Sequence, residues 1–258
     1  MKKVILISID AVRPDGLKQC GNEYLKQLEK ECKYNYSSSS MMPSYTFTCH
    51  YSMAHSIPTQ VHEIVTHVDP PWEYKVKGIF EKVAEAGGKT AMFYSWDSMN
   101  NIRSIDTIKY SFYMDYTAQD RVDDALTDAA LELIPKYNPD FVYLYLADVD
   151  TKGGHIHGWM SDEYLRRISI ALDNVKRVIE KFGDEYSIIL MTDHGGHELR
   201  HGTDMPEDMI IPLFLRGKEF NAGEIFEETS LLDIAPTIAD IMGLEPEEGW
   251  QGRSLCDK

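Results

Sequence analysis

Short runs of continuously apolar residues alternate along the chain with longer stretches of helical, 3.6-residue hydrophobic spacing. Such runs are typical of strands that are buried on both faces of a parallel sheet. The pattern predicts strands at residues 4–9, 90–94, 141–146, 187–191 and 210–215. It predicts helices at residues 17–34, 74–86, 123–137, 163–182 and 231–242, and a further helix that begins near Thr46. This alternation predicts an α/β fold of three layers, α/β/α, with a mostly parallel central sheet.

Two segments, residues 57–71 and 97–119, follow neither pattern. Long connections of this kind are often functional, so we expect both to lie at the surface and to face a substrate. No internal repeat and no linker divides the sequence. We therefore expect residues 1–258 to form a single domain.

The composition narrows the class of partner. The chain has 258 residues, of which 43% are hydrophobic, as in ordinary soluble globular proteins. Its 26 Lys and Arg residues against 42 Asp and Glu residues give a formal net charge of −16, which argues against polymeric nucleic acid and anionic membranes as partners. A small anionic substrate remains compatible with this charge, because a bound metal ion inverts the local field.

The cysteines and the N-terminal sequence indicate in which cellular compartment we expect the protein. Four cysteines, Cys20, Cys32, Cys49 and Cys256, show no CxxC or zinc-finger spacing. The apolar run at residues 4–9 is too short for a signal peptide, and no stretch reaches the length of a membrane span. We therefore expect reduced thiols, no membrane segment and a cytoplasmic location. The oligomeric state is left open.

Acidic residues follow three of the predicted strands. Asp10, Asp150 and Asp193 come at or just after the carboxyl ends of these strands. That edge of a parallel sheet is where α/β proteins bind ligands. Carboxylates gathered at one place repel each other, so this arrangement predicts a bound cation.

Histidines next to these acids complete a predicted metal site. His155, His194 and His201 accompany the acids in the sequence, and mixed carboxylate and imidazole ligands suit zinc best. Six candidate ligands are too many for one tetrahedral ion and suit two ions. Two ions a few ångströms apart can hold both the attacking and the leaving oxygen of a phosphoryl transfer.

Four motifs in order along the chain resemble the alkaline phosphatase superfamily, and its nucleotide pyrophosphatase/phosphodiesterase branch most of all. They are Asp10 after the first strand, PSYTFTCHY at 43–51, DTKGGHIHG at 150–158 and TDHGGH followed by HGTD at 192–204. The resemblance implies an alkaline phosphatase-like fold. It also implies a two-zinc hydrolase of small phosphate esters.

The resemblance assigns roles to individual residues. It implies that Thr46, at a helix N-terminus, is the nucleophile and carries the phosphoryl group as a phospho-threonine. It implies one zinc held by Asp10, Thr46, Asp193 and His194, and a second held by Asp150, His155 and His201. Phosphodiester hydrolysis is the activity that we expect first.

Two positions depart from the family pattern. The segment between Asp150 and His155 is one residue longer than is common in the family, which keeps Asp148 as an alternative ligand; Asp150 is favoured. Cys49 stands where the family often has an asparagine that binds a phosphoryl oxygen, and a thiol is a weaker donor. We keep Cys49 and Phe47 as candidate substrate-binding residues. The second departure leaves the choice between diester and monoester substrates open.

Several rival functions follow from the same residues. A phosphomonoesterase or a phosphonate hydrolase would use the same site. A rival of another class is a module that holds metal and binds a phosphorylated ligand without turnover, for which replacement of Thr46 would cost affinity rather than rate. A sulfatase is disfavoured because no Cys-x-Pro-x-Arg or Ser-x-Pro-x-Arg segment is present. A phosphoglycerate-mutase-like enzyme is disfavoured because such proteins usually have a serine nucleophile and a large inserted domain.

Overall fold

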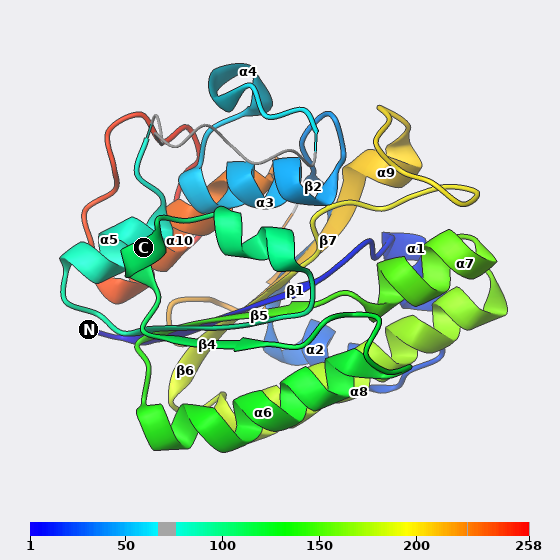
Figure 1. The fold of residues 1–258 in the computed structure, drawn as a ribbon, viewed down its shortest axis with the longest axis horizontal. Helices are drawn as coiled ribbons and strands as arrows, with labels where there is room; N and C mark the ends of the chain where they lie inside the picture. Colours follow the sequence, from blue (N-terminus) through cyan, green and yellow to red (C-terminus); the bar gives the residue numbers. More distant parts are fainter. Residues whose placement is uncertain (67–75, 226, 258) are drawn as a thin grey trace.

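The computed structural model describes residues 1–66, 76–225 and 227–257. In this part of the chain, eight strands form one sheet in the order β4-β3-β5-β1-β6-β7-β2-β8 (Figure 1). They are β1 (Lys3–Ile9), β2 (Lys33–Ser39), β3 (Thr90–Tyr94), β4 (Tyr110–Tyr113), β5 (Phe141–Leu146), β6 (Tyr186–Met191), β7 (Ile210–Arg216) and β8 (Gly223–Glu224). Strand β7 is antiparallel to its neighbours β6 and β2, and the other pairs are parallel. The expected mostly parallel sheet is confirmed.

Helices cover both faces of this sheet (Figure 1). One face carries α3 (Thr46–His55), α5 (Ile79–Glu85) and α10 (Ile234–Met242). The other carries α1 (Pro14–Gln19), α2 (Tyr24–Glu31), α6 (Val122–Tyr137) and α8 (Asp162–Phe182). The shorter helices are α4 (Thr59–His62), α7 (His155–His157) and α9 (Pro206–Met209). The three-layer α/β/α architecture predicted from the sequence is therefore confirmed.

The continuous apolar runs reflect two hydrophobic cores, one on each side of the sheet. In β1, Val4 and Leu6 belong to the core under α3, α5 and α10, and Ile5 and Ile7 belong to the other core. All four side chains are fully buried. A strand that is covered on both faces cannot alternate apolar with polar positions, which explains the sequence pattern.

The single helix expected at residues 17–34 is wrong in its continuity and at its end, although most of this range is helical. Two short helices, α1 and α2, occupy this region, and Gly21 between them has φ +74°. The chain then enters β2, which pairs antiparallel with β7. The Tyr34 ring stacks on Phe214 at a centroid distance of 5.7 Å. Long-range pairing thus ends the helical region before residue 33, and the last two residues of the predicted helix belong to β2.

Other predicted elements differ from the structure only at their boundaries or in local detail. Helix α5 begins at Ile79, and residues 67–75, which include the start of the helix expected at 74–86, lie outside the described residues. The connection at 97–119 contains β4 and two short 3₁₀ turns. The last predicted helix begins as a 3₁₀ turn, Leu231–Asp233, before α10. No helix in the described part of the chain has both the length and the apolar character needed to cross a membrane.

The sheet order places the proposed site. Strand β1 lies between β5 and β6 and is parallel to both, with Ile9 level with Leu146 and Ser8 level with Met191. The segments that follow these three strands therefore meet at the carboxyl ends of the strands. The N-terminus of α3 reaches the same region, because the Thr46 hydroxyl contacts the loop after β6.

Candidate active site

Three buried carboxylates meet at the carboxyl ends of β1, β5 and β6. Asp10 directly follows β1, Asp193 follows β6, and Asp150 lies in a π-helical turn after β5. Their residues are only 1%, 0% and 6% exposed, respectively. One oxygen of each, Asp10 Oδ1, Asp150 Oδ1 and Asp193 Oδ2, accepts no hydrogen bond from the described residues. Buried polar atoms are nearly always satisfied, so these three oxygens are suited to bind a cation.

The first group of possible ligands surrounds the imidazole of His194. Its Nε2 atom lies 3.3 Å from Asp10 Oδ1 and 3.3 Å from Asp193 Oδ2. The same nitrogen is 3.0 Å from the Thr46 hydroxyl oxygen. The structure thus brings together all four residues that the family resemblance assigned to the first metal.

The second group lies beside the first. Asp150 Oδ1 is 3.5 Å from His155 Nε2 and 3.9 Å from His201 Nε2. The His201 ring stacks on the His194 ring at a centroid distance of 4.0 Å, so the two groups adjoin. Ligand atoms of Asp150, His194 and His201 lie within 4.8 Å of one another, whereas the His155 side chain is 41% exposed. His194 could therefore contribute to either ion.

The three histidines share one orientation. In each ring Nδ1 faces a backbone carbonyl, which can only accept, so Nδ1 carries the proton. The distances are 2.8 Å from His194 to Gly195, 3.0 Å from His155 to Leu199 and 2.7 Å from His201 to Ser44. In a neutral ring the Nε2 lone pair then points at the carboxylates. Lone pairs that face carboxylate oxygens repel each other unless a cation lies between them, and ligand histidines in metal sites are held in this way.

Asp148, the alternative ligand, has a different environment. Its Oδ1 atom forms an ion pair with Lys152 Nζ at 2.8 Å. The buried Asp123 carboxylate accepts hydrogen bonds from the backbone N–H groups of Ala147 and Asp148, both at 2.9 Å, and so fixes the turn after β5. A carboxylate already neutralised by a lysine is a poor metal ligand. The geometry therefore favours Asp150 over Asp148.

Thr46 is the first residue of α3, as the sequence predicted, and is 5% exposed. His50, one turn later, lies 2.8 Å from the Thr46 carbonyl oxygen through Nδ1 and 2.9 Å from Ser8 Oγ through Nε2. Burial lowers the pKa of His50, so its ring is neutral near neutral pH. His50 therefore fixes the start of α3 against β1.

The two candidate substrate-binding residues are buried. Phe47 is 1% exposed, lies in the core on the α3 side of the sheet and packs against Tyr51. Cys49 is fully buried, with its sulfur 3.3 Å from Ser40 Oγ. Burial raises the pKa of the Cys49 thiol. Neither side chain is brought to the surface near the carboxylates.

Asp208 organises the loop between β6 and β7, and sequence reasoning missed it. It is fully buried and its carboxylate accepts from His197 Nδ1 at 2.7 Å. It also accepts from the backbone N–H and the hydroxyl of Thr203, at 2.9 and 2.7 Å. These contacts hold the segment that carries His201. Asp208 follows another acid, Glu207, in the four-residue helix α9, and nothing in this short sequence distinguishes the two or signals the role of Asp208.

Replacing Asp208 with alanine should destabilise the protein by about 3 kcal/mol, because it leaves several buried donors without an acceptor. The measurement is urea denaturation followed by circular dichroism. Glu207→Ala, at the adjacent position, should change the free energy of unfolding by less than about 1 kcal/mol. Equal stability of the two variants would show that the Asp208 contacts do not hold this loop.

The electrostatics of the site favour a cation. Burial raises the pKa of the Asp10 carboxyl well above its usual range, and the charges of Asp193 and Asp150 raise it further. Burial also raises the pKa of Asp150. A carboxyl group with a raised folded-state pKa stabilises the fold while it is protonated, and this contribution is lost as the pH rises through the folded-state value. Without metal, these groups therefore oppose folding at neutral pH.

Asp10→Asn, which imitates the protonated carboxyl, should raise the free energy of unfolding of the metal-free protein at pH 7 by more than about 1 kcal/mol. The gain should shrink near pH 4, about the ordinary carboxyl value, where the wild-type group is protonated in the folded state and about half protonated in the unfolded state. Urea denaturation with a chelator at both pH values measures it. A gain of the same size at both would contradict the raised pKa of Asp10.

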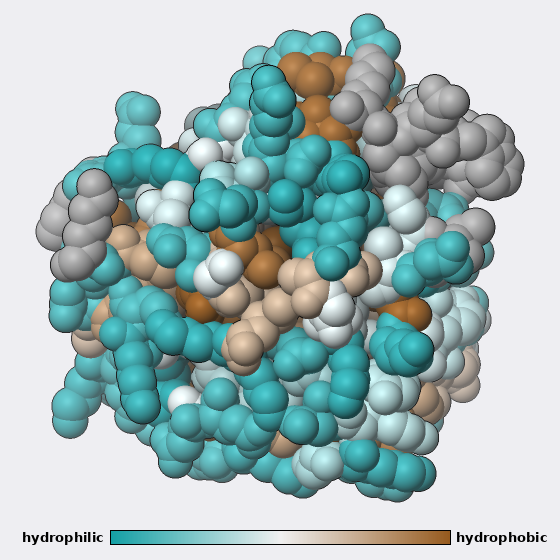
Figure 2. Space-filling model, turned by 90° about the vertical axis from the view of Figure 1, so that its left-hand side faces the viewer, coloured by the Kyte–Doolittle hydropathy of each residue, from teal (hydrophilic) through white to brown (hydrophobic). Residues whose placement is uncertain are grey.

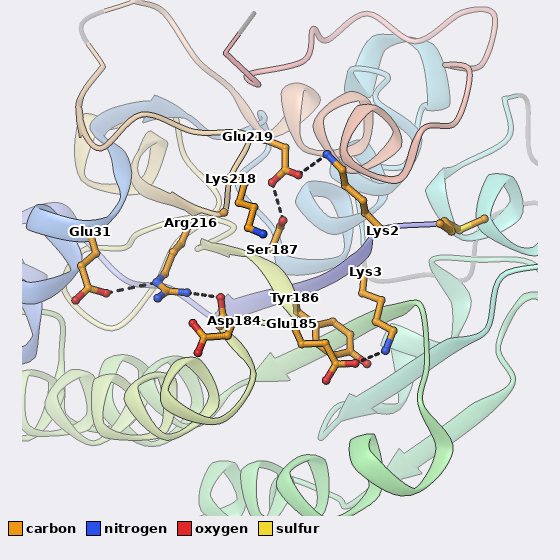
Figure 3. Close-up of a pocket in the computed structure, with 13 residues that line it drawn as sticks. Lys2, Lys3, Glu31, Asp184, Glu185, Tyr186, Ser187, Arg216, Lys218 and Glu219 are labelled. Carbon is orange, nitrogen blue, oxygen red and sulfur yellow. Dashed lines mark hydrogen bonds and ion pairs between the residues drawn. The ribbon is translucent and has the colours of Figure 1, made fainter.

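A cavity of about 740 Å³ lies at the amino-terminal ends of β1 and β6, whereas the carboxylates lie at the carboxyl ends of these strands (Figure 3). Its lining charges compensate one another, with Lys2 2.7 Å from Glu219 and Arg216 3.4 Å from Glu31. Figure 2 views the molecule from the side where Figure 1 places the N-terminus, and hydrophilic side chains dominate this face. None of the proposed metal ligands lines this cavity.

Comparison with known families shows to which family the chain belongs. Residues 4–212 match the model of the type I phosphodiesterase / nucleotide pyrophosphatase family. The match covers most of the chain and all four motifs. The chain belongs to this family, and the resemblance to the alkaline phosphatase superfamily inferred from the motifs is confirmed.

Solved structures show the same fold. Human ectonucleotide pyrophosphatase/phosphodiesterase 5 superposes with a TM-score of 0.81, at 14% identity, over 97% of this chain and 97% of that chain. The phosphonate monoester hydrolase of Silicibacter pomeroyi superposes with a TM-score of 0.77, at 17% identity, over 99% of this chain and 76% of that chain. At such identities the likeness concerns the fold alone.

Among curated proteins, the chain is similar to mutases. It is 29% identical over 140 residues to the 2,3-bisphosphoglycerate-independent phosphoglycerate mutase of Clostridioides difficile strain 630, a match to 52% of this chain and 27% of the mutase. The chain spans about a quarter to a third of the length of the curated relatives that it matches. Phosphoryl transfer is common to these relatives and to the matched family. The sequence analysis disfavoured a phosphoglycerate-mutase-like enzyme, but these matches show that mutases are among the relatives of the chain.

Proposed function

We propose that the chain is a two-metal phosphodiesterase that cleaves small phosphate esters through a covalent intermediate on Thr46. One observation carries this proposal: the Nε2 atoms of three histidines lie beside three carboxylate oxygens that accept no hydrogen bond from the described residues, and one of these nitrogens, of His194, is 3.0 Å from the Thr46 hydroxyl. Such a set of donors fits two divalent cations, and mixed oxygen and imidazole ligands favour zinc.

We assign the ligands of the two proposed ions from the two groups of residues, one around His194 and one around Asp150. The first ion would be held by Asp10, Thr46, Asp193 and His194, and the second by Asp150, His155 and His201. Bound ions would stabilise the negative charge that develops on the phosphoryl oxygens and lower the pKa of the attacking hydroxyl.

Thr46 performs the first step. Its Oγ1 atom forms a bond to phosphorus, the bond from phosphorus to one alcohol breaks, and that alcohol leaves with the proton that the Thr46 hydroxyl gives up. The N-terminus of α3, a helix of ten residues, places its free backbone N–H groups and positive dipole end at the site. Water then cleaves the Thr46–phosphorus bond and releases the phosphate monoester. The contact between His50 and the Thr46 carbonyl keeps the nucleophile in place during both steps.

The basic residues near the site support a diester as substrate. Three of them, Arg13, Lys152 and Arg200, lie on the segments that carry the ligands, and each is already paired. Arg13 bonds Asp15 at 2.9 Å, Lys152 bonds Asp148 at 2.8 Å and Arg200 lies 3.6 Å from Glu198. A diester carries one negative charge at neutral pH, whereas a monoester carries nearly two. A site without a spare cationic side chain on these segments suits the less charged substrate.

A rate comparison tests the proposal. The zinc-loaded protein should hydrolyse bis-p-nitrophenyl phosphate faster than p-nitrophenyl phosphate, because the two share a leaving group and differ in charge. A preference for the monoester would transfer the protein to the phosphatases. Tight metal binding with no turnover of either ester would favour the rival of another class, a module that binds a phosphorylated ligand.

Two further proposals concern cell biology. All four cysteines are free thiols, which supports a reducing compartment such as the cytoplasm. The net charge of −16 supports small esters over polymeric nucleic acid as substrates.

A further inference from the structure

Strand β4 is the last strand at one end of the sheet (Figure 1). It pairs with β3 on one side, and no other strand of the described residues pairs with its outer side. An open edge of this kind offers unpaired N–H and C=O groups to another strand. We use the name β4 edge for residues 109–115.

The β4 edge has a self-complementary charge pattern. Its sequence, KYSFYMD, carries one positive charge at the start, Lys109, and one negative charge at the end, Asp115. Both side chains are exposed. If two such edges pair antiparallel about a two-fold axis at Phe112, each Lys109 lies opposite Asp115 of the other copy. In a parallel arrangement the like charges would lie side by side.

The same antiparallel register places apolar side chains of the two copies opposite one another. Because side chains alternate along a strand, Tyr110, Phe112 and Met114 share one face, the face toward α6. The Tyr110 ring stacks on Tyr137 of α6 at 4.4 Å. In the antiparallel register Tyr110 lies opposite Met114, and Phe112 lies opposite its own counterpart.

A cavity next to this edge has room for side chains of the second copy. It has a volume of about 300 Å³ and is lined by side chains of β3, β4 and α6, among them Phe93, Phe112 and Ile134. On the other face, Tyr113 is 43% exposed and packs against Tyr94 at 5.2 Å. Pairing would cover aromatic surface on both faces of the sheet.

We propose that two copies of the chain associate through the β4 edge, antiparallel about Phe112, and form one sheet that continues through the dimer. The interface is isologous, so each copy uses the same residues, and both Lys109–Asp115 contacts form at once. The Phe112–Phe112 cross-strand pair and the opposite charges at the ends fix the register. The edge belongs to β4, which is separated from β1 by β3 and β5 in the sheet, and the site residues take no part in it.

Charge reversal tests this arrangement without altering the core. The protein is studied by sedimentation velocity from about 1 to about 100 µM, a range that spans moderate affinities. We expect wild type to dimerise in this range. Lys109→Asp and Asp115→Lys should each raise the dimer dissociation constant at least about tenfold, because each places like charges opposite one another twice.

An equimolar mixture of the two variants should restore the dimer. In the mixed pair, an aspartate at position 109 faces a lysine at 115, and Lys109 of the other copy faces Asp115. Restoration also shows that both variants are folded, and circular dichroism and phosphodiester hydrolysis check each alone. A monomeric wild type would overturn the proposal. So would single variants that dimerise as wild type does, or two folded monomeric variants that fail to associate when mixed.

Discussion

Replacing Thr46 with alanine is expected to lower the rate of phosphodiester hydrolysis by at least about 10³-fold, with no loss of the fold. The Thr46 hydroxyl is the one that lies next to His194 Nε2, at 3.0 Å. Nearby hydroxyls are engaged elsewhere: Ser44 Oγ donates to the Thr203 carbonyl and Thr48 Oγ1 donates to the Ile64 carbonyl. The measurement is kcat with bis-p-nitrophenyl phosphate at saturating zinc.

Two controls separate nucleophilic attack from a structural effect. Thr46→Ser keeps a hydroxyl at the same position and should retain part of the activity. Thr48→Ala removes a buried hydroxyl two residues further along the same helix and should keep nearly full activity. Wild-type rates in Thr46→Ala would show that another group, or water itself, attacks phosphorus.

Replacing Asp150 with asparagine should remove about one metal ion per chain and lower activity by more than about 100-fold. Asp150 is the only carboxylate in the described residues that adjoins both His155 and His201. Its loss leaves the second ion with histidine ligands alone. The checks are metal content after dialysis, determined by inductively coupled plasma mass spectrometry, and the hydrolysis rate.

Asp148→Asn is the matched control, because the same change falls two residues away on the same turn. Since Asp148 pairs with Lys152, this variant should hold as many ions as wild type. If Asp148→Asn loses an ion and Asp150→Asn does not, the two carboxylates have been assigned the wrong way round. Addition of a strong chelator to wild type should abolish activity, and zinc should restore it.

The elements that build the site could be predicted because local pattern and burial agree in them. Strands β1, β5 and β6 are covered on both faces, so their sequences are continuous apolar runs, and each run is followed by an acid. Parallel neighbours end at the same edge of a sheet, so the apolar pattern alone predicts that Asp10, Asp150 and Asp193 lie close together. Helix α3 begins at Thr46 as expected.

What the sequence could not provide depends on contacts between distant segments. Strand β2 is a strand because it pairs with β7, more than 170 residues away, and its serines carry no strand signal of their own. Asp208 and Asp123 bind backbone groups of loops whose shape only the fold determines. The orientation of the three ligand histidines likewise depends on carbonyl groups that the sequence pattern does not identify.

The stereochemistry at phosphorus tests the central claim most directly. A phosphodiester made chiral with one sulfur atom is hydrolysed in ¹⁸O-labelled water by the zinc-loaded protein, and the configuration of the product is determined. Attack by Thr46 followed by attack by water inverts phosphorus twice, so we predict retention of configuration. Net inversion would mean that water displaces the alcohol in a single step, and it would contradict the role of Thr46 as nucleophile.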